Sequence, residues 1–263
     1  MFTETFIDKS SIWLIYLITF AWLAIGCELG FRFGRYSKAR WPDAGKASAG
    51  TIMGSALGLL AFLLAFTFGM SSSRFDTRKQ LVLDEAGSIL VAYKRAQSLP
   101  EPQRDECSRL LKEYIRERTD INHLKTLDDI QVAVLRSEEI QDALWAEAAS
   151  LSDRPNAVLS SFMQSLSTLT EYQIKRVRAA AWNRIPSAIV IALYGIAFFG
   201  LAALGFNAGL NEHRPLFPIL MLILAFSLVI VLIIDLERPQ QQLFSVSQEP
   251  MADVARRLQV EQP

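Results

Sequence analysis

Four side chains in the apolar stretch around residue 60 have the types and spacing of a pore lining. Ser55, Phe62, Phe66 and Ser73 fall within roughly 40° of one another on a helix, because each residue advances the helix by about 100°. If several copies of this helix surround an axis, that face forms an apolar neck with hydroxyl groups at both ends. Apolar constrictions can gate ions by dewetting. The alternative is that the two phenylalanines face lipid or fill the core of a bundle.

Small residues follow a second face of the same helix. A stripe of small residues lets another helix approach closely, because no side chain holds the two backbones apart. We therefore expect a neighbouring helix to pack on it, from the same chain or from a second copy. The stripe consists of Gly50, Gly54, Gly58, Ala61, Ala65 and Gly69.

Charged residues mark the ends of two apolar stretches. Arg74 and Arg78 follow the stretch around residue 60, where they could attract anions or anchor the helix at the lipid head groups. Asp235 and Glu237 end the last apolar stretch, where the helix dipole disfavours negative charge. We expect a compensating cation there, from Arg238 or from the Arg74/Arg78 pair, in a structural clamp. A divalent cation is the alternative, although two carboxylates supply few of the about six to eight oxygens that Ca²⁺ takes.

The chain offers little for catalysis or for a metal site. Its two histidines and two cysteines form no His-Glu-x-x-His pattern, and we find no phosphate-binding glycine loop and no Ser/His/Asp set at membrane depth. Glu28 is ionisable and lies within an apolar stretch, which often marks function, but Arg32 one turn later can pair with it. We predict that the protein is not an enzyme and binds no cofactor and no metal.

The elements that position these residues can be read from composition. Hydrophobic residues make up 51 % of the 263 residues and charged residues 21 %, and the mean hydropathy is +0.22. A positive mean hydropathy is compatible with this share of charged residues because apolar and charged residues occupy different segments of the chain. Four segments reach the roughly 20 apolar residues that cross a bilayer, at about 12–31, 50–70, 185–206 and 216–234.

We predict an all-α fold class, with four transmembrane helices and a helical extramembrane bundle inserted between spans two and three. The expected domains are an N-terminal transmembrane pair (1–70), a helical extramembrane domain (71–184), a C-terminal transmembrane hairpin (185–234) and a polar C-terminal tail (235–263). Because no breaker ends the second span, its helix should continue into the domain. A packed seam with 3–4 spacing is expected at Leu159, Phe162, Leu166 and Leu169.

Net charge restricts the partners but leaves the orientation open. The chain has 27 Lys+Arg and 27 Asp+Glu, a net charge of +0, so it lacks a global basic footprint for nucleic acid. The total of Lys and Arg near the membrane ends favours an N-terminus inside, whereas the basic loop after span one favours the reverse. We adopt the first orientation, which places residues 71–184 in the cytoplasm.

Several segments resemble the bacterial bestrophin-like domain family. They are residues 59–68 (LLAFLLAFTF), 73–81 (SRFDTRKQL), 84–86 (DEA) and 235–239 (DLERP). That family is distantly similar to the bestrophin anion channels. The resemblance implies a ring of subunits in the bacterial inner membrane, with five as the expected number. It also implies that span two lines an anion-conducting neck and that the helical domain is cytoplasmic.

Two functions compete on these grounds. The first is a bestrophin-like ion channel, a homo-oligomer in the bilayer that conducts a small anion such as chloride. The second is a non-conducting membrane scaffold or sensor whose helical domain binds a partner. In the second case the stripe of small residues only holds the membrane helices of one chain together. An oligomer with Phe62 and Phe66 on its axis favours the channel. A tightly packed monomer or dimer that co-purifies with a partner favours the scaffold or sensor.

Overall fold

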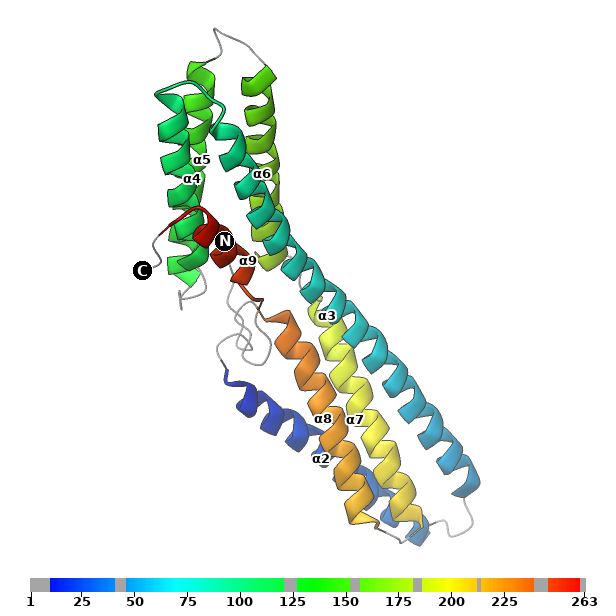
Figure 1. The fold of residues 1–263 in the computed structure, drawn as a ribbon. Coiled ribbons are helices and arrows are strands. Elements are labelled where there is room, and N and C mark those ends of the chain that lie inside the picture. Colours follow the sequence, from blue (N-terminus) through cyan, green and yellow to red (C-terminus); the bar gives the residue numbers. More distant parts are fainter. Residues whose placement is uncertain are drawn as a thin grey trace. The chain divides into compact units, whose positions relative to one another are not determined.

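The protein is helical throughout the part of the chain that its computed structural model describes, residues 10–40, 46–120, 127–151, 157–181, 186–211, 214–238 and 246–260. Within these ranges there is no strand, so the predicted all-α class is confirmed (Figure 1). The helices are α2 (Ile12–Arg40), α3 (Lys46–Ala96), α4 (Gln103–Asp120), α5 (Leu127–Ser150), α6 (Ala157–Ala181), α7 (Ser187–Leu210), α8 (Leu216–Glu237) and α9 (Glu249–Arg257).

The chain divides into two compact units, each with its own apolar core. The helical domain comprises residues 76–183 and 246–263, and the membrane unit comprises residues 3–75 and 184–245. Helix α3 contributes to both units. Four helices, α2, α3, α7 and α8, are long and apolar enough to cross a membrane, as the sequence predicts. The chain is therefore a multi-pass membrane protein.

Helices α2 and α7 form the closest pair in the membrane unit. They run parallel, because Gly26 lies against Phe198 while Gly34, further along α2, lies against Phe206. A Cβ atom built on Gly26 would come within 2.9 Å of the Phe198 carbonyl oxygen. Built Cβ atoms would overlap backbone atoms of the partner helix at four more glycines. Those are Gly30 and Gly34 on α2 and Gly205 and Gly209 on α7. Their four-residue spacing is the one that lets two membrane helices touch along their backbones.

Polar contacts supplement this apolar pairing of α2 with α7. The Thr19 and Tyr194 hydroxyl oxygens lie 2.7 Å apart, and Thr19 is fully buried. The indole Nε1 of Trp22 donates to the Tyr194 carbonyl oxygen at 3.4 Å. The two bonds join residues that are 175 and 172 positions apart in the sequence. These bonds restrict the rotation of each helix about its own axis more than the glycine contacts alone would.

Helix α3 is much longer than a membrane span. Its 51 residues correspond to about 76 Å at a rise of about 1.5 Å per residue, whereas a hydrocarbon core is about 30 Å thick. The predicted continuation of the second span beyond the membrane as one helix is confirmed. The membrane part packs on α7 near Gly200, whose built Cβ would lie 3.6 Å from Leu60 and 3.8 Å from Leu57.

The helical domain is held by a core drawn from α3, α4, α5, α6 and α9. The predicted seam of α6 is buried, with Leu159 4 % exposed, Phe162 and Leu169 fully buried, and Leu166 2 % exposed. It belongs to the same apolar cluster as Leu111 and Ile115 of α4 and Leu144 of α5. The periodicity therefore identified the correct face of this helix.

Residues 235–263 were expected to form a polar tail, but they contain a helix, α9 (Glu249–Arg257). Met251, Val254 and Leu258 of this segment are buried in the core of the helical domain. The helix ends in a Schellman motif, in which the Val260 N–H donates to the Ala255 carbonyl oxygen at 3.0 Å. Gln259 carries the left-handed conformation of this motif, with φ at 56°. The C-terminal segment is thus part of the folded domain.

Candidate functional site: the membrane part of α3 and its charged end

The membrane part of α3 has one face packed against its own chain and an opposite face left exposed. Leu60 is fully buried and Leu64 is 4 % exposed, whereas Phe62 and Phe66 are 65 % and 60 % exposed. By helix geometry the two faces are about 160° apart. The two exposed rings stack on each other, with centroids 6.5 Å apart and an angle of 15° between their planes. Ser55 and Ser73 are also exposed and share this face with the phenylalanines.

The small residues of α3 form a third face, about 110° from the packed one. A Cβ atom built on any of its four glycines would meet no atom of the described chain within 4 Å. Ala61 and Ala65, between them, are exposed. Within one chain, close helix packing therefore uses the glycines of α2 and α7, and this stripe presents its backbone outward. The glycines are Gly50, Gly54, Gly58 and Gly69.

The acidic end of α8 is paired by an arginine of α3. Nη1 of Arg74 lies 3.4 Å from Oε2 of Glu237, and the two side chains are only 20 % and 15 % exposed. This ion pair joins α3 to α8 where the expected clamp would lie. Arg78 lies one turn further along α3, in the helical domain.

Two further charged residues at this end of α8 are buried. Asp235 is fully buried, and Arg238 is 2 % exposed. Nη2 of Arg238 donates to the Ser10 carbonyl oxygen at 2.8 Å and so joins the end of α8 to the start of α2. Pro239, the last residue of the DLERP segment, lies outside the described residues.

A buried carboxylate in the helical domain organises a second cluster, which the sequence reading missed. Glu85 of α3 is fully buried. Its Oε1 lies 2.7 Å from Nε of Arg118, and its Oε2 accepts a hydrogen bond from Nη1 of Arg176 at 2.7 Å. The Tyr114 hydroxyl donates to Oε1 at 2.8 Å. Burial by itself would raise the pKa of the Glu85 carboxyl, but the two guanidinium groups outweigh it and lower that pKa.

The cluster extends through amide side chains to two more elements. Gln141 of α5 donates to Gln173 of α6 and accepts from the Thr170 hydroxyl at 2.7 Å. Arg176 reaches Gln248, just before α9, at 2.8 Å. No motif signals this network, because its members come from five separate parts of the sequence. The DEA segment at 84–86, noted above only as part of a resemblance, contains its central residue.

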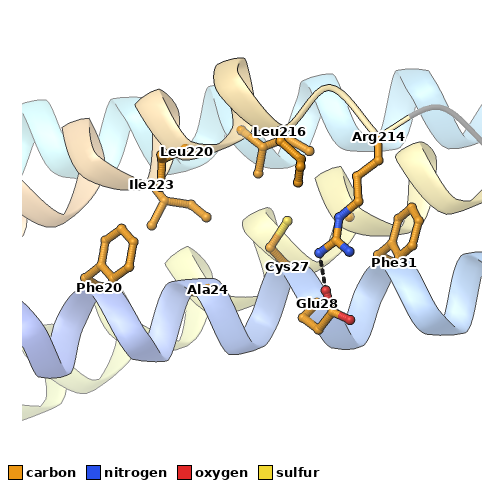
Figure 2. Close-up of a pocket in the computed structure, with 11 residues that line it drawn as sticks. Phe20, Ala24, Cys27, Glu28, Phe31, Arg214, Leu216, Leu220 and Ile223 are labelled. Atoms are coloured by element: carbon orange, nitrogen blue, oxygen red, sulfur yellow. Dashed lines mark hydrogen bonds and ion pairs between the residues drawn. The ribbon is translucent and has the colours of Figure 1, made fainter.

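At the opposite end of the membrane unit, Glu28 accepts from two arginines. Nε of Arg32 donates to its Oε1 at 2.9 Å, which is the local pair expected from the sequence. Arg214, just before α8, donates to Oε2, and its guanidinium lies 4.6 Å from the centre of the Phe31 ring (Figure 2). The second arginine could not be predicted, because it is 186 residues away in the chain.

The described residues hold no group of three or more His, Cys, Asp and Glu side chains that could bind a metal. Cys27 and Cys107 are both buried and are not joined in a disulfide. Among the residues seen here, the candidate functional features are therefore the exposed faces of α3 and the charged clusters.

Comparisons with known proteins agree with this architecture. The chain resembles a bacterial bestrophin homologue from Klebsiella pneumoniae at 14 % identity, over 94 % of this chain and 97 % of that one, with a TM-score of 0.66. A single-substitution variant of that homologue matches at 15 % identity and a TM-score of 0.66, covering 95 % of this chain and 98 % of the other. Another variant gives 14 % identity and a TM-score of 0.67, with 95 % and 97 % covered.

These likenesses show the fold. No curated protein matches the chain. The model of the bestrophin-like domain matches residues 20–251, which is most of the sequence. The chain therefore belongs to the bestrophin-like domain family.

Proposed function

We propose that this protein is one subunit of an oligomeric ion channel, in which α3 lines an anion-conducting neck at Phe62 and Phe66. The observation that carries the proposal is the exposure of these two rings on the face of α3 opposite the one that packs on its own chain. Family membership adds the precedent of bestrophins as membrane ion channels. The pore-lining set is Ser55, Phe62, Phe66 and Ser73.

The exposed stripe of small residues supports assembly into an oligomer. It lies about 90° around the helix from the phenylalanine face, so a neighbouring copy could pack on the stripe while the phenylalanines point to a common axis. A stripe that meets none of the described residues of its own chain is what a second copy would need for close approach. The expected assembly is a homo-oligomer in the bilayer, and five is the subunit number we expect.

The charges near the end of the neck bear on ion preference. Arg74 follows Ser73, and its charge is balanced in this structure by Glu237. An anion entering from this side would meet the hydroxyl of Ser73 and the arginine before the apolar rings. We propose that this end faces the cytoplasm of a bacterial cell, with residues 71–184 on that side of the inner membrane.

Chloride flux from reconstituted liposomes tests the proposal. The wild type should conduct, and Phe62→Ala/Phe66→Ala should change the flux because it widens and wets the apolar neck. The matched control is Phe199→Ala/Phe217→Ala. It removes two phenylalanines that are each 71 % exposed on other spans, and it should leave flux unchanged. Absence of flux from folded, inserted wild-type protein would favour the scaffold or sensor instead, and equal effects of the two pairs would place the pore elsewhere.

A further inference from the structure

A cavity of about 150 Å³ lies among α2, α7 and α8 of the membrane unit. Its body is apolar and is lined by Phe20 and Ala24 of α2 and by Leu216, Leu220 and Ile223 from the start of α8 (Figure 2). The cavity is partly open, so an apolar ligand can enter it from outside. Because these three helices cross the membrane, the apolar molecules at hand are lipids.

The rim of this cavity carries more positive than negative charge. Among the described residues that line it, Glu28 is the one carboxylate, and it pairs both with Arg214, which also lines the cavity, and with Arg32. The side chain of Arg214 is 43 % exposed and that of Arg32 is 76 % exposed. Each guanidinium has five N–H donors, so both retain donors after pairing with Glu28. These three described side chains, two cations and one anion, together carry a charge of +1.

The rim also lies where lipid head groups are expected. Arg214 comes after the end of α7 at Leu210 and two residues before the start of α8 at Leu216. The Phe31 ring beneath its guanidinium fixes the arginine at this level. An apolar pocket with a cationic rim at the end of a membrane span is complementary to an amphiphile with an acyl tail and an anionic head.

We infer that this cavity binds an anionic phospholipid, with part of one acyl chain inside and the phosphate on Arg214 and Arg32. The positive charge of the rim should favour an anionic phospholipid over a zwitterionic one. The inference does not depend on ion conduction, since a scaffold with this membrane unit would carry the same site.

The protein contains its own reporter for this site. Cys27 lines the cavity between Ala24 and Glu28, and it is 6 % exposed (Figure 2). The other cysteine, Cys107, is fully buried in the helical domain, where burial raises the pKa of its thiol to about 12. A Cys107→Ser variant of the full-length chain would confine labelling to Cys27.

The test is the rate at which a small, uncharged maleimide labels Cys27 in reconstituted vesicles. One set of vesicles is phosphatidylcholine alone, and the other is an equimolar mixture with phosphatidylglycerol. We expect labelling to be severalfold slower with phosphatidylglycerol, because the bound lipid covers the thiol. Arg32→Gln/Arg214→Gln should abolish this difference. Lys38→Gln/Arg40→Gln, which removes two positive charges of α2 beyond the rim, should preserve it.

A second measurement covers the case in which the double variant folds poorly. Native mass spectrometry of the wild type in detergent should retain phosphatidylglycerol in preference to phosphatidylcholine, and Ile223→Trp, which fills the cavity, should lose that preference. Equal labelling rates in both vesicles would overturn the proposal. So would protection of Cys27 in both vesicles and in every variant, because labelling would then not depend on a bound anionic lipid.

Discussion

At the scale of single residues, the Glu85 cluster illustrates what burial does to charge. A fully buried carboxylate is tolerated because two guanidinium groups and the Tyr114 hydroxyl surround it. Such a cluster gives modest net stability compared with an apolar core, but removing one member leaves an uncompensated buried charge. The ion pair therefore matters more for the arrangement of α3, α4 and α6 than as a gain in energy.

This arrangement predicts a particular dependence of stability on pH. The pKa of Glu85 is lower in the folded protein than the roughly 4.3 of an unfolded chain, so its contribution is fully present above that value. The contribution is lost as the pH falls below about 4.3 towards the folded pKa. The denaturant concentration at the midpoint of unfolding, followed by circular dichroism in detergent, should therefore decrease as the pH is lowered through that range.

Substitution of Glu85 should both destabilise the domain and remove this pH dependence. Glu85→Gln leaves Arg118 and Arg176 buried together, so we expect a loss of about 3–5 kcal/mol in the free energy of unfolding. The matched control is Glu106→Gln, since Glu106 pairs with Arg109 on the exposed side of α4 and its loss should matter little. Equal effects of the two substitutions would contradict this account of the cluster.

The end of α9 gives a prediction of opposite sign. Gln259 adopts a positive φ, which costs a residue with a Cβ atom free energy that glycine does not incur. Gln259→Gly should therefore stabilise the helical domain by about 1 kcal/mol in unfolding experiments. Leu258→Gly, one position earlier, is the control and should destabilise, because Leu258 is buried in the core. A destabilising effect of Gln259→Gly would mean that the motif is not formed in solution.

Single residues also show where sequence reasoning stops. Phe162 and Leu166 were identified as core positions because helix periodicity is local information. The partners of Glu85 could not be found in this way, because Arg118 and Arg176 are 33 and 91 residues away in the chain. The same holds for Arg214 opposite Glu28. A periodic pattern says which face of a helix is buried, and tertiary structure decides what covers it.

At the scale of elements, the glycine stripes of α2, α7 and α3 have similar spacing but different surroundings. Those of α2 and α7 meet the backbone of a partner helix, whereas that of α3 meets nothing in the part of the chain that the structure describes. Sequence spacing drew attention to the α3 stripe and left Gly26, Gly30 and Gly34 unremarked, although they follow the same pattern. Spacing alone cannot say which stripe serves the fold of one chain and which is left for another copy.

Alanine substitutions at matched glycines should separate these two roles. Gly30→Ala would force the α2 and α7 backbones apart, so we expect a large loss of folded protein after solubilisation. Gly54→Ala meets open space in a single chain and should leave folding intact, while shifting the oligomer towards smaller species. Size-exclusion chromatography with light scattering measures both effects. An intact oligomer in the Gly54→Ala variant would argue against the stripe as an interface between subunits.

At the scale of the whole molecule, the C-terminal segment constrains the topology. Met251 and Val254 of α9 lie in the same apolar core as α4, α5 and α6. Helix α9 therefore lies on the same side of the membrane as α4, α5 and α6. The four helices of the described residues that could cross a membrane were predictable from hydropathy. Helix α9 was not, because a nine-residue helix within a polar tail gives a weak periodic signal.

This constraint predicts the outcome of a reporter fusion. With the N-terminus inside, a fluorescent protein fused after Pro263 should fold in the cytoplasm and fluoresce, while alkaline phosphatase at the same place should stay inactive. Labelling of a cysteine introduced at Gln97, an exposed position in the helical domain, should place this domain on the same side of the membrane as the fused protein. A periplasmic C-terminus would contradict the proposed cytoplasmic location of residues 71–184.

The pairing of α2 with α7 also has a consequence for the order of events during synthesis. The Trp22 to Tyr194 bond joins residues that are 172 positions apart, and helices α4, α5 and α6 of the helical domain are made between them. At about 5–20 residues per second, α2 waits roughly 9 to 34 s in the bilayer before its partner emerges from the ribosome. During that interval its bare glycine backbone is open to any other helix, so the insertion machinery or a chaperone would have to shield it until α7 arrives.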